Sequence, residues 1–162
     1  MFKQYDKAVY NSYGIVTVKR IETKTVASKS KKFYVLSVDN NQMTILCPVD
    51  DSSAMRPIAN ELEVKQVLAY IANTQVKIDA LTWNRRYREY MELLKTGEFI
   101  KIAEVYKKLV TYKGSNELSF GERKMLDMAK GLLTSEISLV LGLDENDTDA
   151  LLELARSGDT QF

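Results

Sequence analysis

Histidine is absent from the 162-residue sequence, and cysteine occurs once, at Cys47. Without histidine there is no Ser–His or Cys–His pair and no imidazole ligand for a metal ion. One cysteine cannot form an intramolecular disulfide or a thiolate zinc site. Carboxylates remain as candidate catalytic groups, but no glycine-rich phosphate loop accompanies them. The composition therefore argues against an enzyme, a metal site and a bound cofactor.

Long apolar runs are also missing. No segment reaches the roughly 18 residues that a membrane-spanning helix needs, and the first ten residues lack the apolar centre of a signal peptide. Hydrophobic residues make up 45% of the chain and charged residues 28%, a balance typical of soluble globular proteins. We expect a cytoplasmic protein that binds no membrane and is a monomer.

Charge is distributed unevenly, although the net charge is only +1. Residues 1–58 contain nine Lys or Arg and five Asp or Glu, and residues 77–130 contain twelve and eight, so each segment carries +4. Residues 131–162 contain one Arg and seven acids, a net charge of −6. A basic body with an acidic end is typical of a nucleic-acid-binding surface. Ordinary surface variation explains the same numbers, and composition does not decide between the two.

Two modules with different hydrophobic periods follow one another. Residues 1–58 are rich in Val, Ile, Tyr and Thr with a rough period of two, interrupted by polar turns at Ser28–Lys32 and Asp39–Asn41. Four or five strands are too few for a sandwich, so we expect a small, strongly curled barrel. From residue 59 onward the apolar residues recur at helical spacing. The fold class is therefore α+β by segregation, with residues 59–162 forming a helical domain with an acidic C-terminal end.

Five helices are predicted in this second module, and their ends carry recognisable signals. The apolar stripes run through residues 62–71, 83–94, 100–109, 125–137 and 151–154. Gly97, Gly114 and Gly142 are placed to end the second, third and fourth helices. Ser119–Glu122 forms a capping box that opens the fourth helix, and Asp144 or Asp147 could cap the last one.

The most unusual segment spans residues 80–94, with the sequence ALTWNRRYREYMELL. It holds the only tryptophan, Trp83, followed at once by Arg85, Arg86 and Arg88. On a helix Arg85 and Arg88 share a face, with Arg86 beside them. Trp83 falls in the first turn, where a side chain can project beyond the helix end. Arginines that neutralise phosphates beside an aromatic wedge favour binding to duplex DNA in the minor groove.

Ordinary structural roles account for the same residues equally well. Trp83 lies at helical spacing from Tyr87 and Tyr90, and such an aromatic stripe is typical of a buried core. Lys124 lies in the first turn of the capped helix, whose free amides could receive a phosphate, but an ordinary surface turn explains it equally. Arg20 and Lys24 either protect an edge strand from aggregation or face an acidic partner.

Several motifs resemble the CarD/CdnL family of bacterial RNA polymerase-binding transcription factors, and most closely its CdnL branch. The helical signature is carried by TWNRRYREYMELLKTG (82–97), IAEV (102–105) and LSFGERKMLDMAKGLLTSEI (118–137). The segment DKAVYNSYGIVTVKRIET (6–23) resembles the opening strands of the family. The resemblance covers residues 2–139 with its spacing kept.

This resemblance implies a function for each module. The N-terminal module would be a Tudor-like barrel that binds the RNA polymerase β subunit, partly by adding its sheet edge to a strand of that subunit. By position, Lys24 matches a basic residue of this interface, and Arg20 and Leu46 are further candidate contacts. The helical module would contact promoter double-stranded DNA in the minor groove, without sequence specificity, at the upstream edge of the transcription bubble.

The resemblance also assigns the residues of the helical module. Trp83 would wedge into the minor groove and stabilise the open complex at housekeeping promoters. Arg85 and Arg88 match basic DNA-contacting positions, Arg86 is their neighbour in the motif, and Lys124 is a further candidate contact.

Three positions depart from the family pattern. Tyr5 stands where a glycine is usual, Asn11 where a proline is usual, and Leu46 where some members have arginine.

An alternative function for the whole chain is a protein-only adaptor of RNA polymerase, with Trp83 in the core and no direct DNA role. An enzyme with paired carboxylates is a further alternative, for which no supporting constellation exists.

Overall fold

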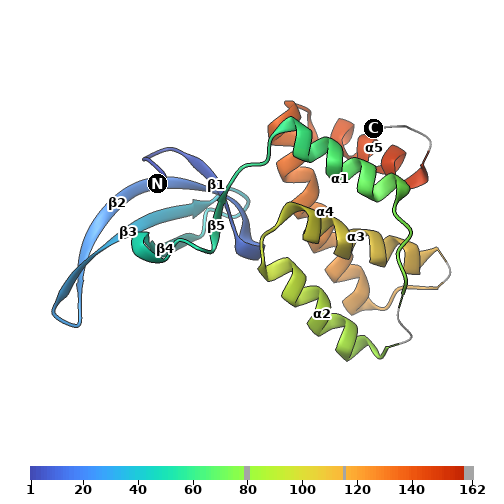
Figure 1. Cartoon of the computed structure of the whole chain (residues 1–162), viewed down its shortest axis with the longest axis horizontal. Coiled ribbons are helices and arrows are strands. Elements are labelled where there is room, and N and C mark those ends of the chain that lie inside the picture. The colour runs from blue at the N-terminus through green and yellow to red at the C-terminus, as the bar shows by residue number, and fades with distance from the viewer. Residues whose placement is uncertain (79–80, 115, 159–162) are drawn as a thin grey trace. The chain divides into compact units, whose positions relative to one another are not determined.

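The computed structural model describes residues 1–78, 81–114 and 116–158. By its internal contacts the chain divides into two compact units, Met1–Ile58 and Ala59–Phe162. The first contains the strands and the second the helices (Figure 1). We refer to them as the β unit and the helical unit, and the predicted α+β segregation is confirmed.

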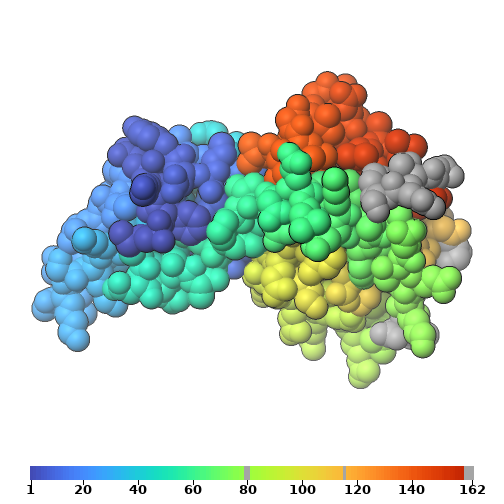
Figure 2. Space-filling view, turned by 45° about the horizontal axis from the view of Figure 1, so that its top comes forward, coloured from blue at the N-terminus to red at the C-terminus, as the bar shows by residue number. Residues whose placement is uncertain are grey.

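The β unit is one antiparallel sheet of five strands in the order β4-β3-β2-β1-β5. The long strands β2 and β3 are visibly curved (Figure 1), and they extend beyond the strands on either side of them (Figure 2). The elements are β1 (Lys7–Tyr10), the short 3-10 turn η1 (Asn11–Tyr13), β2 (Gly14–Val26), β3 (Lys29–Val38), β4 (Thr44–Pro48), the 3-10 turn η2 (Val49–Asp51) and β5 (Met55–Pro57).

A β-bulge in β2 decides which side chains face the core of this sheet. Before the bulge Val18 pairs with the buried Leu36, but after it Arg20 pairs with Val35, the preceding residue of β3. Paired residues of an antiparallel ladder share a face, and successive residues alternate. The extra residue, Lys19, therefore turns Arg20 to the face opposite Val18, although the two are only two positions apart. A strict period of two would have placed both on the core side.

The hairpin turns differ from the sequence prediction in detail. The β2–β3 turn consists of Ala27 and Ser28, with φ angles of 49° and 64°, and both angles are typical of a two-residue type I′ turn. The polar turn predicted at Ser28–Lys32 is therefore wrong in extent, because β3 already begins at Lys29. In the β3–β4 turn the residue with positive φ is Gln42, at 60°, rather than one of the Asp or Asn residues before it.

The helical unit contains the five predicted helices. They are α1 (Glu61–Asn73), α2 (Trp83–Lys95), α3 (Phe99–Lys113), α4 (Phe120–Leu141) and α5 (Glu145–Ser157). The Ser119–Glu122 capping box is confirmed, and Asp144 caps α5 through the backbone N–H of Asp147. Gly97 and Gly142 follow α2 and α4 with positive φ, as expected for helix-ending glycines. No helix of the described ranges is both long enough and apolar enough to cross a membrane.

The core of the helical unit is built from one face of each helix, and a few predicted core residues lie outside it. Leu62 is 64% exposed, whereas Val64, Val67 and Ile71 of the same helix are buried. At 100° per residue Leu62 lies about 200° from Val64, on the opposite side of α1. The apolar residues of the sequence therefore predict a wider buried face on α1 than the structure has. Ile100, Met128 and Leu154 are exposed as well.

A buried carboxylate ties the start of the helical unit to α4. Glu136 is 1% exposed, and its Oε1 accepts a hydrogen bond of 2.9 Å from the backbone N–H of Ala59. Burial of a polar group is tolerated when it is hydrogen-bonded. Ala59 is the first residue of the helical unit and immediately precedes Asn60, the N-cap of α1. Local sequence patterns do not indicate this contact, because its two partners are 77 positions apart in the chain.

The left-handed backbone of Tyr5 generates a stability prediction. Tyr5 has φ of 71° and a side chain that is 72% exposed. A non-glycine residue in this region costs about 1–2 kcal/mol, while a glycine adds about 0.4–1 kcal/mol of unfolded-chain entropy. We expect Tyr5→Gly to raise the free energy of unfolding of the β unit by about 0.5–1 kcal/mol.

Hydrogen exchange of the β1 and β2 amides measures this change within the β unit. Tyr5→Ala is the matched control, because it removes the same side chain but keeps the Cβ. Equal effects of both variants would contradict backbone strain as the cause.

Candidate functional site

Trp83 is the first residue of α2, and its indole ring is partly buried. The ring packs edge-on against Tyr87 at a centroid distance of 5.7 Å and lies 6.4 Å from the ring of the buried Tyr90. It also packs against the core of the helical unit. The ring is therefore neither fully buried in the core nor fully exposed at the surface. Part of the indole is anchored, and part is accessible to a ligand.

Gly121, the second residue of α4, lies directly against the indole. A Cβ atom built on Gly121 would stand 3.1 Å from Trp83 Nε1 and 3.5 Å from Cε2 and Cζ2. The backbone of α4 can approach the ring this closely only because the residue has no side chain. The glycine of the Ser-Phe-Gly-Glu sequence is therefore explained by its contact with Trp83.

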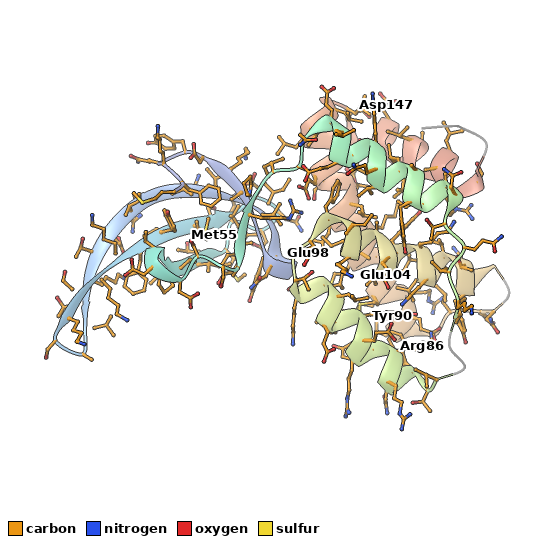
Figure 3. The ribbon with its side chains drawn as sticks, in the orientation of Figure 1. Met55, Arg86, Tyr90, Glu98, Glu104 and Asp147 are labelled. Carbon is orange, nitrogen blue, oxygen red and sulfur yellow. The ribbon has the colours of Figure 1, made fainter. Side chains whose placement is uncertain are left out.

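Arg86 lies beneath the same ring and is enclosed in the helical unit. It is 6% exposed, and its Nη2 donates a hydrogen bond of 2.7 Å to Oε1 of Glu122. Its guanidinium carbon lies 5.3 Å from the centroid of the Trp83 ring and 4.5 Å from that of Tyr112. Arg86 and Tyr90 both project from α2 toward the neighbouring helices (Figure 3). Arg86 is predicted to contact DNA together with Arg85 and Arg88, but in the structure its guanidinium is buried and paired with Glu122, an arrangement that suits positioning of the neighbouring ring.

Glu122 joins this ion pair to the cap of α4. Its Oε2 accepts the backbone N–H of Ser119, while Ser119 Oγ accepts the backbone N–H of Glu122. Burial by itself raises the pKa of Glu122, but the hydrogen bonds from Ser119 and Arg86 outweigh it and leave the pKa below its ordinary value. Burial likewise lowers the pKa of Arg86, and Glu122 more than reverses this. Both side chains are therefore charged at neutral pH.

The other predicted DNA-binding residues are at the surface. Arg85, Arg88 and Lys124 are exposed, and within the described ranges none of them forms an ion pair. The first turn of α2 contains no acidic residue, and Thr82 provides no side-chain cap. A helix N-terminus in this state carries unsatisfied N–H groups and a partial positive charge. The surface around Trp83 is therefore suited to a polyanion.

The three residues predicted to bind polymerase share one face of the β unit. Arg20 pairs with Val35, and Val35 pairs with Leu46 on the edge strand β4, so Arg20, Val35 and Leu46 lie in one row across the sheet. Lys24 lies on the same face of β2, four residues beyond Arg20 and after the bulge. Leu46 is 43% exposed. The structure thus brings Arg20, Lys24 and Leu46 together on the face opposite the core.

Glu22 lies between the two cations of this face. It accepts from Arg20 at 3.0 Å and from Lys24 at 3.2 Å. The hydrogen bonds of these two side chains, that of Lys24 first, lower the pKa of Glu22. Solvent-exposed pairs of this kind contribute little to stability. Their arrangement is more informative for a binding surface, because it keeps two cations and an exposed leucine on one side of the sheet.

The chain thus combines a sheet unit that has two cations on one face with a helical unit that has an aromatic residue and exposed arginines at the start of α2. Residues 66–153 match the family model described as CarD, C-terminal domain, and residues 2–59 match the model described as CarD-like/TRCF RID domain. The chain is 31% identical over 147 residues to the Bacillus subtilis (strain 168) protein named "Putative transcription factor YdeB", covering 90% of this chain and 95% of that protein.

The chain therefore belongs to the CarD family of transcription factors. The resemblance inferred from its motifs is confirmed, and the β unit is the Tudor-like domain of this family.

The contact between Gly121 and Trp83 predicts the effect of a single methyl group. We expect Gly121→Ala to push the indole outward, because the new Cβ would stand 3.1 Å from Nε1. The emission of Trp83, the only tryptophan, should shift to the red while the protein stays folded. Gly131→Ala is the matched control in the same helix, since nothing lies within 4 Å of its added Cβ. It should stabilise the protein by up to about 1 kcal/mol without changing the emission. Identical spectra for both variants would contradict the contact.

The Arg86–Glu122 pair predicts a pH-dependent contribution to stability. Glu122→Gln leaves a buried arginine without its counter-ion and should lower the free energy of unfolding by about 3 kcal/mol at pH 7. Because the pKa of Glu122 in the folded protein lies below its ordinary value of 4.5, the pair contributes fully above that pH. The contribution is lost as the pH falls through the folded pKa.

Urea denaturation of wild type and Glu122→Gln at several pH values measures this difference. It should be largest near neutrality and shrink below about pH 4.5. Glu117→Gln, at an exposed position, provides the control and should have little effect at any pH. A difference between wild type and Glu122→Gln that is constant down to pH 3 would refute the charged pair.

Proposed function

We propose that this protein binds the RNA polymerase β subunit through its β unit and promoter DNA through its helical unit. Trp83 enters the minor groove at the upstream edge of the transcription bubble, and Arg85, Arg88 and Lys124 contact backbone phosphates. The bound protein slows collapse of the bubble and stabilises the open complex. The proposal extends the family membership to a mechanism at named residues.

One observation carries the DNA-binding part of the proposal. The indole of Trp83 is held at a helix end by Gly121 and by the buried Arg86–Glu122 pair, while exposed Arg85 and Arg88 lie beside it. A wedge must resist being pushed back, and an anchored ring does so better than a flexible one. Phosphate contacts orient the protein on the duplex, and apolar wedges partly unstack a base step. The surface combines both elements.

The energies are of a suitable size for such a mechanism. Stacking is worth about 1.4 kcal/mol per base step, so a melted promoter stays open only while contacts with protein offset this cost, and small changes in those contacts alter the balance. A wedge with a few phosphate contacts, worth a few kcal/mol, can shift this balance by more than tenfold. The helical unit need bind DNA only weakly on its own, because attachment to polymerase raises its local concentration to about the millimolar range. Free protein should therefore bind DNA weakly, without sequence preference and with strong salt dependence.

The shared face of the β unit supports the polymerase-binding part. Arg20, Lys24 and Leu46 lie on one face that reaches the edge strand β4. An edge strand offers unpaired backbone groups to a strand of a partner, and neighbouring side chains provide the specificity. Arg20 and Lys24 lie on β2, one strand further from this edge than β3, and these cations, partly balanced by Glu22, suit a partner with acidic residues.

A protein-only adaptor is the second candidate function. The contacts of Trp83 with Tyr87 and the core favour it, since a tryptophan packed in this way stabilises the fold without any DNA. In that case the exposed arginines would serve only solubility. The two functions differ in whether the accessible part of the indole has a ligand.

The lifetime of the open complex on a housekeeping promoter distinguishes them. We expect wild-type protein to lengthen the lifetime after competitor challenge, and Trp83→Ala to lose most of this effect because the wedge is missing. Trp83→Phe keeps a ring in the same place and should retain part of the effect. Binding of each variant to polymerase, measured in parallel, should be unchanged.

Lys24→Glu tests the other module. Reversing this charge should weaken polymerase binding while leaving the DNA affinity of the free protein unchanged. A wild-type protein that binds polymerase but does not alter the lifetime would sink the DNA part of the proposal and favour the adaptor.

A further inference from the structure

Phe120, next to the glycine that supports Trp83, is a second aromatic residue at this surface. It is the first residue of α4, and 76% of its side chain is exposed. Single exposed apolar residues are common on proteins and need no explanation by themselves. The position of Phe120 is what gives it meaning, because Gly121 lies against the indole. Trp83 and Phe120 thus occupy the first positions of two helices whose N-terminal turns are in contact.

Among the described residues of the helical unit, the exposed aromatic rings lie in this region. Within the described residues of that unit, the large exposed aromatic side chains are Tyr87 and Phe120. Tyr87 contacts Trp83 directly, and Phe120 is joined to it through Gly121. The other strongly exposed apolar residues of the unit are aliphatic, such as Leu62 on α1. If exposed rings were distributed at random over this unit, we would not expect both of them near Trp83.

The charges around Phe120 indicate the kind of partner. Arg123 and Lys124 follow in the first turns of α4, and Arg85 and Arg88 lie on α2 beside Trp83, all of them exposed. Glu122 does not offset them at the surface, because it is buried and paired with Arg86. Glu117 is the exposed acid that precedes the cap of α4. Four exposed cations around exposed rings suit a nucleic acid, whose phosphates and bases need both.

We propose that Phe120 is a second DNA-contacting ring, which stacks on an unpaired base at the junction between duplex and melted strand. This inference rests on the function proposed above and adds a second contacting residue, Phe120, to the site at the edge of the bubble. Phenylalanine has no polar group to read a base edge, but any base offers a face for stacking. Such faces are exposed where Trp83 opens a base step, whereas an intact duplex offers none. The pair Trp83 and Phe120 therefore selects a fork over an intact duplex.

Two measurements on the full chain test this inference. The first is the affinity of the free protein for a fork, a duplex with a single-stranded extension, relative to a fully paired duplex of the same length. Wild type should prefer the fork, and Phe120→Ala should lose about fivefold or more of that preference. Phe120→Tyr should keep it, and Leu62→Ala, which removes a similarly exposed apolar side chain, should leave it unchanged.

Salt dependence separates stacking from charge. Phe120→Ala should lower the affinity for the fork without changing the slope of log K against log salt, because no phosphate contact is removed. Lys124→Ala should reduce the steepness of that slope by about one. A change of slope in Phe120→Ala would overturn the stacking assignment.

The second measurement is the open-complex lifetime with Phe120→Ala. A shortened lifetime with normal polymerase binding is the expected result. If Trp83→Ala shortens the lifetime and Phe120→Ala does not, this inference fails while the proposed function stands. If wild type itself has no effect on the lifetime, the proposed function fails. Loss of polymerase binding in Phe120→Ala would show that the ring docks on protein, which would overturn the inference.

Discussion

The buried ion pair between Arg86 and Glu122 is the interaction on which the candidate DNA surface depends. It joins α2 to α4, supports the indole from below and belongs to the capping box that starts α4. A buried pair of this kind adds little net stability, since desolvation offsets much of the attraction, but it fixes geometry when both partners are hydrogen-bonded. Here the geometry is that of two helix ends. The same glutamate thus sets where α4 begins and where Trp83 can lie.

This arrangement also explains why the motif residues form a unit although they are far apart in the chain. Ser119 caps the helix, Gly121 leaves room for the ring, and Glu122 neutralises Arg86. Each residue type is required for a different physical reason, and together they serve one side chain on another helix. Arg86 and Glu122 are paired with each other in the interior, whereas Arg85, Arg88 and Lys124 are exposed and form no ion pair within the described residues.

Much of this could be read from the sequence. The change of period near residue 59, the capping box at Ser119 and the glycines at 97 and 142 were sufficient to place the modules and most helix ends. Local patterns cannot report contacts between distant segments, so the burial of Arg86 and of Glu136 was missed. Nor could they locate the bulge after Val18, where one extra residue transfers Arg20 from the core face to the outer face. A prediction from strict alternation of side chains along a strand fails where a β-bulge interrupts the pairing of the strands.

The hydrogen bond from Ala59 to Glu136 has a mechanical consequence. The chain passes from β5 to the cap of α1 through Ile58 and Ala59 alone. If the protein binds polymerase and DNA at the same time, as proposed, a pull on the connecting chain reaches the helical unit at Ala59. The hydrogen bond from Ala59 to Glu136 then transmits part of this force to α4, the helix whose first turn contacts the indole of Trp83. The connection to the β unit and the support of Trp83 thus involve the same helix.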